Sequence, residues 1–206
     1  LLNALTFLIN FRVFEGVIAV YFAYVTGSYA LAMGVLVAIH VSAGLFEVPT
    51  GVFSDRIGRR ATMIVYHIAV TAGTICIYFA TSAELLFVAA IFMGFGMAMR
   101  TGAVSAYVYE NLETLGKVDA FKKFEGGRQA LGRWGLVVSG ILGTALIYFY
   151  DMHTAVLATI VSYLAAVVLS LWLVDVRALE QGKSNVYADL ADAWRLFTSD
   201  VSLRNI

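Results

Sequence analysis

The chain has 206 residues, of which 61% are hydrophobic and only 14% are charged, and its formal net charge is zero. A soluble domain of this size carries about 25% charged and about 45–50% apolar residues, so the composition indicates a membrane protein. The Lys and Arg residues form no long basic run, which argues against a nucleic-acid binder. The single cysteine, Cys76, has no partner within the chain, which excludes a disulfide framework.

Six stretches are long and apolar enough to cross a bilayer. A spanning helix needs about 20 mostly apolar residues, since each residue rises about 1.5 Å across a hydrocarbon core of about 30 Å. The sequence predicts spans over residues 4–24, 30–51, 61–80, 84–108, 129–150 and 153–174. The strands of a membrane barrel alternate apolar and polar residues, whereas these runs are continuously apolar. We therefore expect an all-α membrane protein.

The connections between the predicted spans are of two kinds. Residues 25–28, 81–84 and 150–153 are short and contain no Lys or Arg, whereas 52–60, 111–128 and the tail are basic. By the positive-inside rule the basic connections face the cytoplasm. Both termini are then cytoplasmic, as an even number of spans requires. The predicted location is a bacterial-type inner (plasma) membrane.

The tail differs in character from the spans. Residues 175–185 are polar and linker-like, and residues 186–198 place apolar and charged side chains on opposite faces at helical spacing. The sequence thus predicts a transmembrane domain over 1–174 and a cytoplasmic segment over 175–206 with an amphipathic helix on the membrane surface. Because the chain opens on Leu1 and not on Met, we expect a trimmed segment of a longer protein.

The sharpest local signal is the decapeptide Gly51-Val-Phe-Ser-Asp-Arg-Ile-Gly-Arg-Arg60 between the second and third predicted spans. Its two glycines permit backbone conformations that other residues resist. Asp55 can pair with Arg59 or Arg60, or cap the next helix. On loop chemistry alone, a positive-inside turn anchored by its arginines explains the same residues equally well.

The decapeptide resembles motif A of the major facilitator superfamily, Gly-x-x-x-Asp-Arg-x-Gly-Arg-Arg/Lys, in the same position between spans two and three. The residues that match the defined positions of the motif are Gly51, Asp55, Arg56, Gly58, Arg59 and Arg60. Phe53 differs from the family pattern, which usually has Leu at that position. The resemblance implies the N-terminal half of a permease, built as two inverted three-helix repeats and completed by a second six-helix half. It also implies that Asp55 and Arg59 engage Glu110 at the end of span four, with Arg60 as the alternative partner, and so latch the outward-open state.

Ionisable residues deep inside the first and fourth predicted spans are candidates for a cavity. Arg12 and Glu15 are in the first span and Arg100 is in the fourth. An arginine at the centre of a spanning helix costs about 2.5–3.5 kcal/mol, so it needs a partner or water. Arg12 and Glu15 are three residues apart and can simply neutralise each other. Alternatively, Glu15 pairs across a cavity with Arg100, which resembles the motif B arginine that is implicated in proton transfer in proton-coupled relatives.

The fifth predicted span is rich in small residues, which let helices approach closely. We expect its small residues to pack against another span: Gly132, Gly135, Ser139, Gly140 and Gly143. In the drug-antiporter branch of the superfamily, the equivalent stretch is motif C, Gly-Pro-x-x-Gly-Gly. Residues 139–144 lack its proline and two of its three glycines, which weakens the case for a drug antiporter. His40 and His67 are predicted packing residues, and no pair has zinc-site spacing, so we expect no metal and no cofactor.

The leading functional prediction is a secondary active transporter or facilitator that moves a small solute by alternating access, as an antiporter or symporter with protons as a candidate coupling ion. Its partners would be the solute, the lipid bilayer and a second six-helix half, and no nucleic acid. The alternative is a half-size membrane module that acts as a homodimer or without transport. An intramembrane protease is disfavoured because Ser139 follows Val137-Val138 instead of a Gly-x-Ser motif, and His153 falls in an outer loop.

Overall fold

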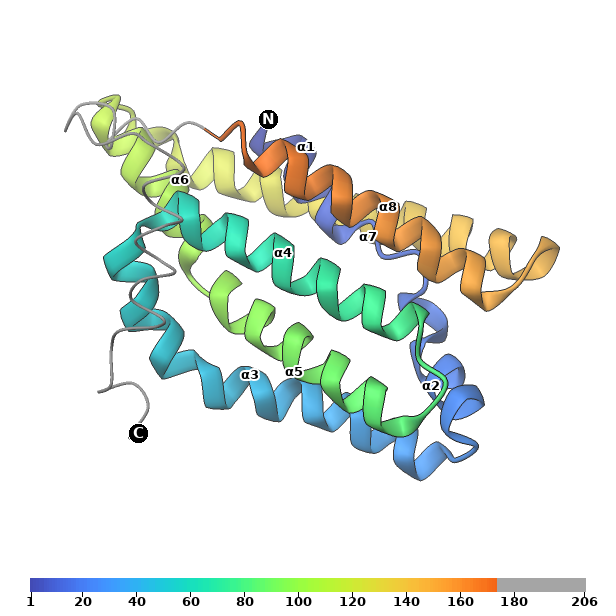
Figure 1. Ribbon diagram of the computed structural model, residues 1–206. Coiled ribbons are helices and arrows are strands. Elements are labelled where there is room, and N and C mark those ends of the chain that lie inside the picture. Colours follow the sequence, from blue (N-terminus) through green and yellow to red (C-terminus); the bar gives the residue numbers. More distant parts are fainter. Residues whose placement is uncertain (174–206) are drawn as a thin grey trace.

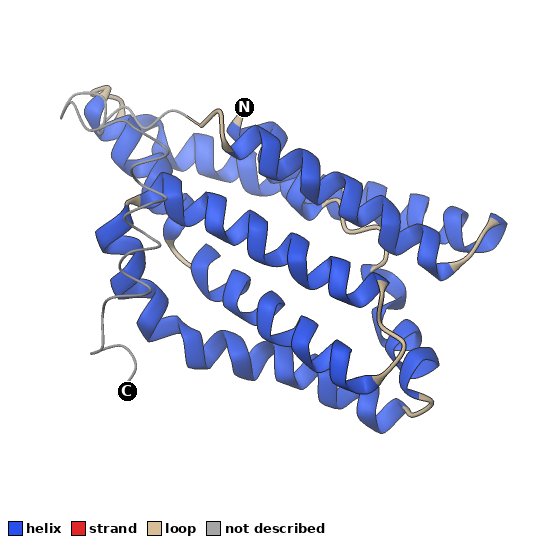
Figure 2. Cartoon of the chain, viewed as in Figure 1, coloured by secondary structure: helices blue, strands red, loops and turns tan. Residues whose placement is uncertain are grey.

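A computed structural model describes residues 1–173 of the chain, apart from the side chains of Val52, Asp55 and Arg56. The predicted linker and the predicted amphipathic helix over 186–198 lie outside the described residues. Within residues 1–173 the chain is a bundle of helices joined by short loops, with no strand (Figures 1 and 2). The predicted all-α class is confirmed.

Six helical segments are long and apolar enough to cross a membrane, as predicted. Spans one and four each consist of two helices, and the other spans are single helices. The helices are α1 (Leu2–Asn10), α2 (Ile18–Thr26), α3 (Tyr29–Ile57), α4 (Arg59–Tyr78), α5 (Ala83–Arg100), α6 (Ala103–Thr114), α7 (Phe121–Phe149) and α8 (Met152–Ser170).

The basic connections are much shorter than predicted. The predicted loop over 52–60 is wrong, because α3 continues to Ile57 and only Gly58 separates it from α4. The predicted loop over 111–128 is also wrong, since α6 ends at Thr114 and α7 begins at Phe121. Charged residues limit the part of a helix that can lie in the hydrocarbon core of the bilayer. They do not end the helix itself, because Lys, Arg and Glu are good helix formers. The helices stop instead where Gly58 and Gly116 take positive φ angles of 86° and 66°.

The third span is the most buried of the described spans. Its helix α4 packs against α5 on one side and α8 on the other, and α5 in turn packs along α3 (Figure 1). On the other side of the bundle, α1 packs on α7 and α8. Spans three and six therefore contact each other, with spans one and four on either side of them.

The bundle has two chemically different ends. One end, here called the basic end, carries the N-terminus, the turn at Gly58 and the connection 115–120 (Figure 1). The opposite end carries the turns at 27–28, 79–82 and 150–151. At that end the Asp151 carboxylate accepts a hydrogen bond from the Thr154 amide at 2.6 Å and caps α8, and this bond lowers the pKa of Asp151.

Spans one and four are interrupted, although continuous helices were expected there. In span one the helix stops after Asn10 and resumes at the 3₁₀ turn Glu15–Val17, with tight hydrogen bonds such as Phe11 N–H to the Leu8 carbonyl at 3.1 Å. In span four, α5 ends at Arg100 and α6 begins after Gly102, whose φ is 77°. The two interrupted spans occupy equivalent positions in the two predicted three-helix repeats.

Candidate functional site

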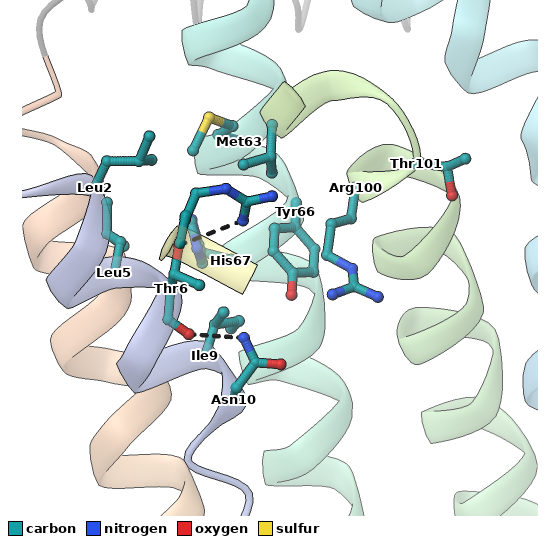
Figure 3. A pocket seen from close by; sticks show the side chains of 12 residues that line it. Leu2, Leu5, Thr6, Ile9, Asn10, Met63, Tyr66, His67, Arg100 and Thr101 are labelled. Carbon is teal, nitrogen blue, oxygen red and sulfur yellow. Dashed lines mark hydrogen bonds between the residues drawn. The ribbon is translucent and has the colours of Figure 1, made fainter. Parts of the chain in front are cut away.

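A pocket with a volume of about 200 Å³ opens beside the break in span four (Figure 3). The pocket is lined by α1, by α4, by the residues that flank the break between α5 and α6, and by Arg128 of α7. Its apolar lining is mostly leucine and isoleucine from α1. Its polar lining consists of Thr6, Asn10, Tyr66, His67, Arg100, Thr101 and Arg128.

Arg100 is the last residue of α5 and lines this pocket. Its side chain extends beside the ring of Tyr66, as Figure 3 shows, and the two groups are within electrostatic range of each other. Arg100 is exposed, and no other described residue forms a hydrogen bond or ion pair with it. An arginine turned toward lipid is costly, so this surface is expected to face water or another protein surface.

Arg12 and Glu15 lie together in the break of span one. The Arg12 guanidinium and the Glu15 carboxylate are 3.3 Å apart, and Arg12 also donates to the Ile9 carbonyl at 3.3 Å. Of the two pairings left open by the sequence, the structure contains this local one and not the pairing of Glu15 with Arg100. Glu15 nevertheless keeps 46% of its side chain exposed.

The motif A residues Arg59 and Ser54 form a polar cluster with Glu110 at the basic end. Arg59 Nε lies 3.3 Å from Glu110 Oε1, which joins the start of α4 to α6. Arg59 also donates to the buried Ser54 hydroxyl at 3.0 Å, and Ser54 in turn accepts from the Thr62 hydroxyl at 3.1 Å. The predicted role of Asp55 rests on a side chain outside the described residues.

The other motif A residues have separate positions. Arg60 donates to the Leu171 carbonyl at 2.9 Å and so joins α4 to the end of α8, not to Glu110. Gly51 lies within α3, and Gly58 forms the turn. Arg56 belongs to α3, but its side chain is outside the described part.

A buried ion pair that the sequence did not reveal also lies at the basic end. Glu125, only 8% exposed, is bonded to Arg128 through both carboxylate oxygens. It also accepts from Ser105 at 3.0 Å and Gln129 at 3.1 Å, while Arg128 donates to Thr6 at 3.4 Å. The cluster joins α1, α6 and α7. The only signal in the sequence was the Glu-x-x-Arg-Gln spacing, which places three polar groups on one helix face.

Three of the small residues of span five lie against span one. A Cβ atom added at Gly135 would lie 3.0 Å from the Phe7 carbonyl, and one at Gly132 would lie 3.0 Å from the Asn10 amide. Gly143 lies against the Val13 carbonyl, and Ser139 is 2% exposed. Gly140 is the exception, because open space surrounds it. These contacts bring the backbones of α7 and span one together.

The two intramembrane histidines differ. His40 is exposed, and its Nδ1 atom lies 2.9 Å from the Leu36 carbonyl. His67 is 2% exposed and lines the pocket; its imidazole interacts with the Met63 backbone one turn earlier, but its Nδ1 atom has no well-aligned hydrogen-bond partner among the described residues. Within residues 1–173, no group of three or more His, Cys, Asp or Glu side chains could hold a metal ion.

Within residues 1–173, six apolar spans and a charged turn between spans two and three indicate an integral membrane protein. Residues 1–204 match the Major Facilitator Superfamily, and the chain belongs to this family of membrane transporters. The six spans are consistent with the N-terminal half of its fold. Neither the curated proteins nor the solved structures contain a match to the chain. Membership of the family implies a small-molecule substrate and a lipid bilayer as partners.

Proposed function

We propose that the chain forms the first half of a secondary transporter that works by alternating access, and that a second six-span half completes its solute cavity. The two broken spans are the observation that carries this proposal. In secondary transporters, discontinuous helices at equivalent positions of the repeats surround the solute and ion sites. Here both breaks carry an arginine, Arg12 in span one and Arg100 in span four.

The orientation is part of the proposal, with the basic end in the cytoplasm. We expect Ser82→Cys at the opposite end to react with a membrane-impermeant maleimide in intact cells. Lys117→Cys should react only after permeabilisation. Both positions are exposed, whereas Ile57, in the same basic region, is 7% exposed and would label poorly from either side. The reverse pattern in a background without other cysteines would overturn the orientation.

The contact between Arg59 and Glu110 supports a latch at the basic end. It joins the motif A turn to α6, which is the part of span four that follows the break. If the contact exists only while the basic end is closed, it contributes a free-energy difference between the closed and open states, as any conformational bias requires. We propose that Arg59, Glu110 and Asp55 hold this end shut in the outward-open state.

The latch is tested by Glu110→Gln in the complete protein that contains this chain. A partly exposed ion pair is worth about 1 kcal/mol or less, so its loss should shift the population of open states by up to about fivefold. The readout is maleimide labelling of Val104→Cys, which lines the pocket, in inside-out vesicles. We expect faster labelling and slower solute uptake.

Glu113→Gln is the matched control, because Glu113 is an exposed carboxylate on the same helix, three residues further on. It should leave labelling and uptake at wild-type values. Identical labelling rates in the two variants would remove the latch from the mechanism. The same uptake assay with and without an imposed pH gradient tests whether the Glu15 carboxylate couples protons to transport. If it does, Glu15→Gln should lose only the gradient-driven component.

A further inference from the structure

The pocket beside the span-four break has an excess of positive charge. Arg128 is neutralised by Glu125, and in the break of span one Arg12 is neutralised by Glu15. Arg100 lines the same pocket, and no described carboxylate lies in contact with it. Its charge is therefore the one that a ligand in this pocket would meet.

The start of α6 adds to this positive potential. This helix has 12 residues, begins after Gly102 and has no side-chain cap at its N-terminus. The first amide N–H groups of a helix lack intrahelical partners and favour negative charge. Thr101, which precedes the helix, and Val104, which belongs to its first turn, both line the pocket. An anion placed beside Arg100 would lie close to these amides.

A buried imidazole provides a separate indication of a ligand. Nδ1 of His67 is buried without a well-aligned hydrogen-bond partner, although the imidazole interacts with the Met63 backbone one turn earlier, and the residue lines the same pocket. Buried polar atoms without well-aligned partners are rare in folded proteins and often have a functional role or bind a water or an ion. Tyr66, one residue earlier on α4, adds a hydroxyl group beside Arg100 (Figure 3).

We infer that this pocket is the first half's share of the solute site and that it takes a small solute with a carboxylate or phosphate group. Arg100 and the first turn of α6 would hold the anionic oxygens, with His67 and Tyr66 as hydrogen-bond partners. The inference rests on the proposed transporter function, because the second half must close the pocket.

The test is the thermal unfolding midpoint of the complete protein in a neutral detergent with succinate, inorganic phosphate or the neutral succinamide. If the affinity lies in the range of typical KM values of enzymes, about 1 μM–1 mM, then about 10 mM of each probe is nearly saturating. We expect at least one anion to raise the midpoint and succinamide to leave it unchanged. Arg100→Gln should weaken binding of that anion by about tenfold or more, since a charge-assisted hydrogen bond is lost.

Two further variants separate binding from folding. Arg100→Lys keeps the charge and should retain part of the anion effect. Arg133→Gln removes an exposed arginine of α7 that does not line the pocket, and it should retain all of the effect. An equal response to succinate and succinamide, no response to either anion, or an unchanged anion affinity in Arg100→Gln would overturn the anion site.

The outcomes also distinguish the two proposals. If binding is not selective for charge, but Glu110→Gln and Glu113→Gln differ in labelling and uptake as expected, the anion site is overturned and alternating access remains supported. If binding is selective for charge but the two variants label and transport alike, the result supports the anion site and counts against the latch. If phosphatidylglycerol stabilises the protein and neither soluble anion does, the pocket binds a lipid headgroup, and the proposal of an anionic solute is overturned.

Discussion

Replacing Glu125 by glutamine is expected to lower the free energy of unfolding by about 3–5 kcal/mol, because the change leaves the Arg128 charge buried without its partner. The Arg128 side chain is only 13% exposed, so water cannot replace the lost carboxylate fully. The Ser105 and Gln129 donors would also lose a charged acceptor. Unfolding of the complete protein in mixed micelles of increasing denaturing-detergent content measures the difference.

A double-mutant cycle separates the ion pair from a general loss of packing. Glu125→Gln and Arg128→Gln should each destabilise strongly, whereas the double variant should recover part of the loss, since no buried charge is left unpaired. Arg133→Gln on the exposed face of α7 is the control and should change stability by about 0.5 kcal/mol at most. Strictly additive losses would show that Glu125 and Arg128 do not depend on each other.

This ion pair shows where hydropathy-based prediction stops. The positive-inside rule uses Lys and Arg to orient loops, and the predicted loop over 111–128 therefore included both Glu125 and Arg128. In the structure, α7 begins at Phe121, so both residues lie on a helix that faces α1 and α6. Whether a charge near a span end is solvated or buried depends on the neighbouring helices, which hydropathy does not contain.

The number and placement of the spans could be predicted because the bilayer sets the length of an apolar helix. The breaks in spans one and four could not be, since a hydropathy window averages over about 19 residues. The break in span one also depends on a distant contact, because the amide of Phe14 donates to the Thr159 hydroxyl of α8 at 3.4 Å. Such a contact over 145 residues is a property of the folded bundle.

Some contacts of the candidate site could be predicted, either from the spacing of residues or from the resemblance to a family. The ion pair of Arg12 and Glu15 follows from their spacing, whereas the contact of Arg59 with Glu110, 51 residues apart, was expected only from the motif A resemblance. A cavity beside Arg100 was expected, but the walls of the pocket were not predicted, because they come from four separate segments: α1, α4, the break between α5 and α6, and α7. Spacing finds local partners, and resemblance finds the distant ones that a family shares.

Alanine at Gly143 is expected to destabilise the bundle by about 3 kcal/mol or more, because its Cβ atom would overlap the Val13 carbonyl. That carbonyl belongs to the break in span one, where the backbone is not held in a regular helix. The obstacle is backbone and not a flexible side chain, so relief requires α7 or the break itself to move. Gly140→Ala on the same helix meets open space and should be neutral or stabilising by up to about 1 kcal/mol through helix propensity.

The comparison of the two glycine variants also reports on function. If the break in span one lines the solute cavity, a shift of its backbone in Gly143→Ala should reduce uptake in the protein that still folds, while Gly140→Ala should transport like the wild type. Detergent unfolding and uptake in proteoliposomes measure the two effects on the same preparations. Equal stability of the two variants would mean that α7 and the break do not approach as closely as the structure places them. Lower stability with unchanged uptake would instead make the contact structural and leave the break in span one without a role in transport.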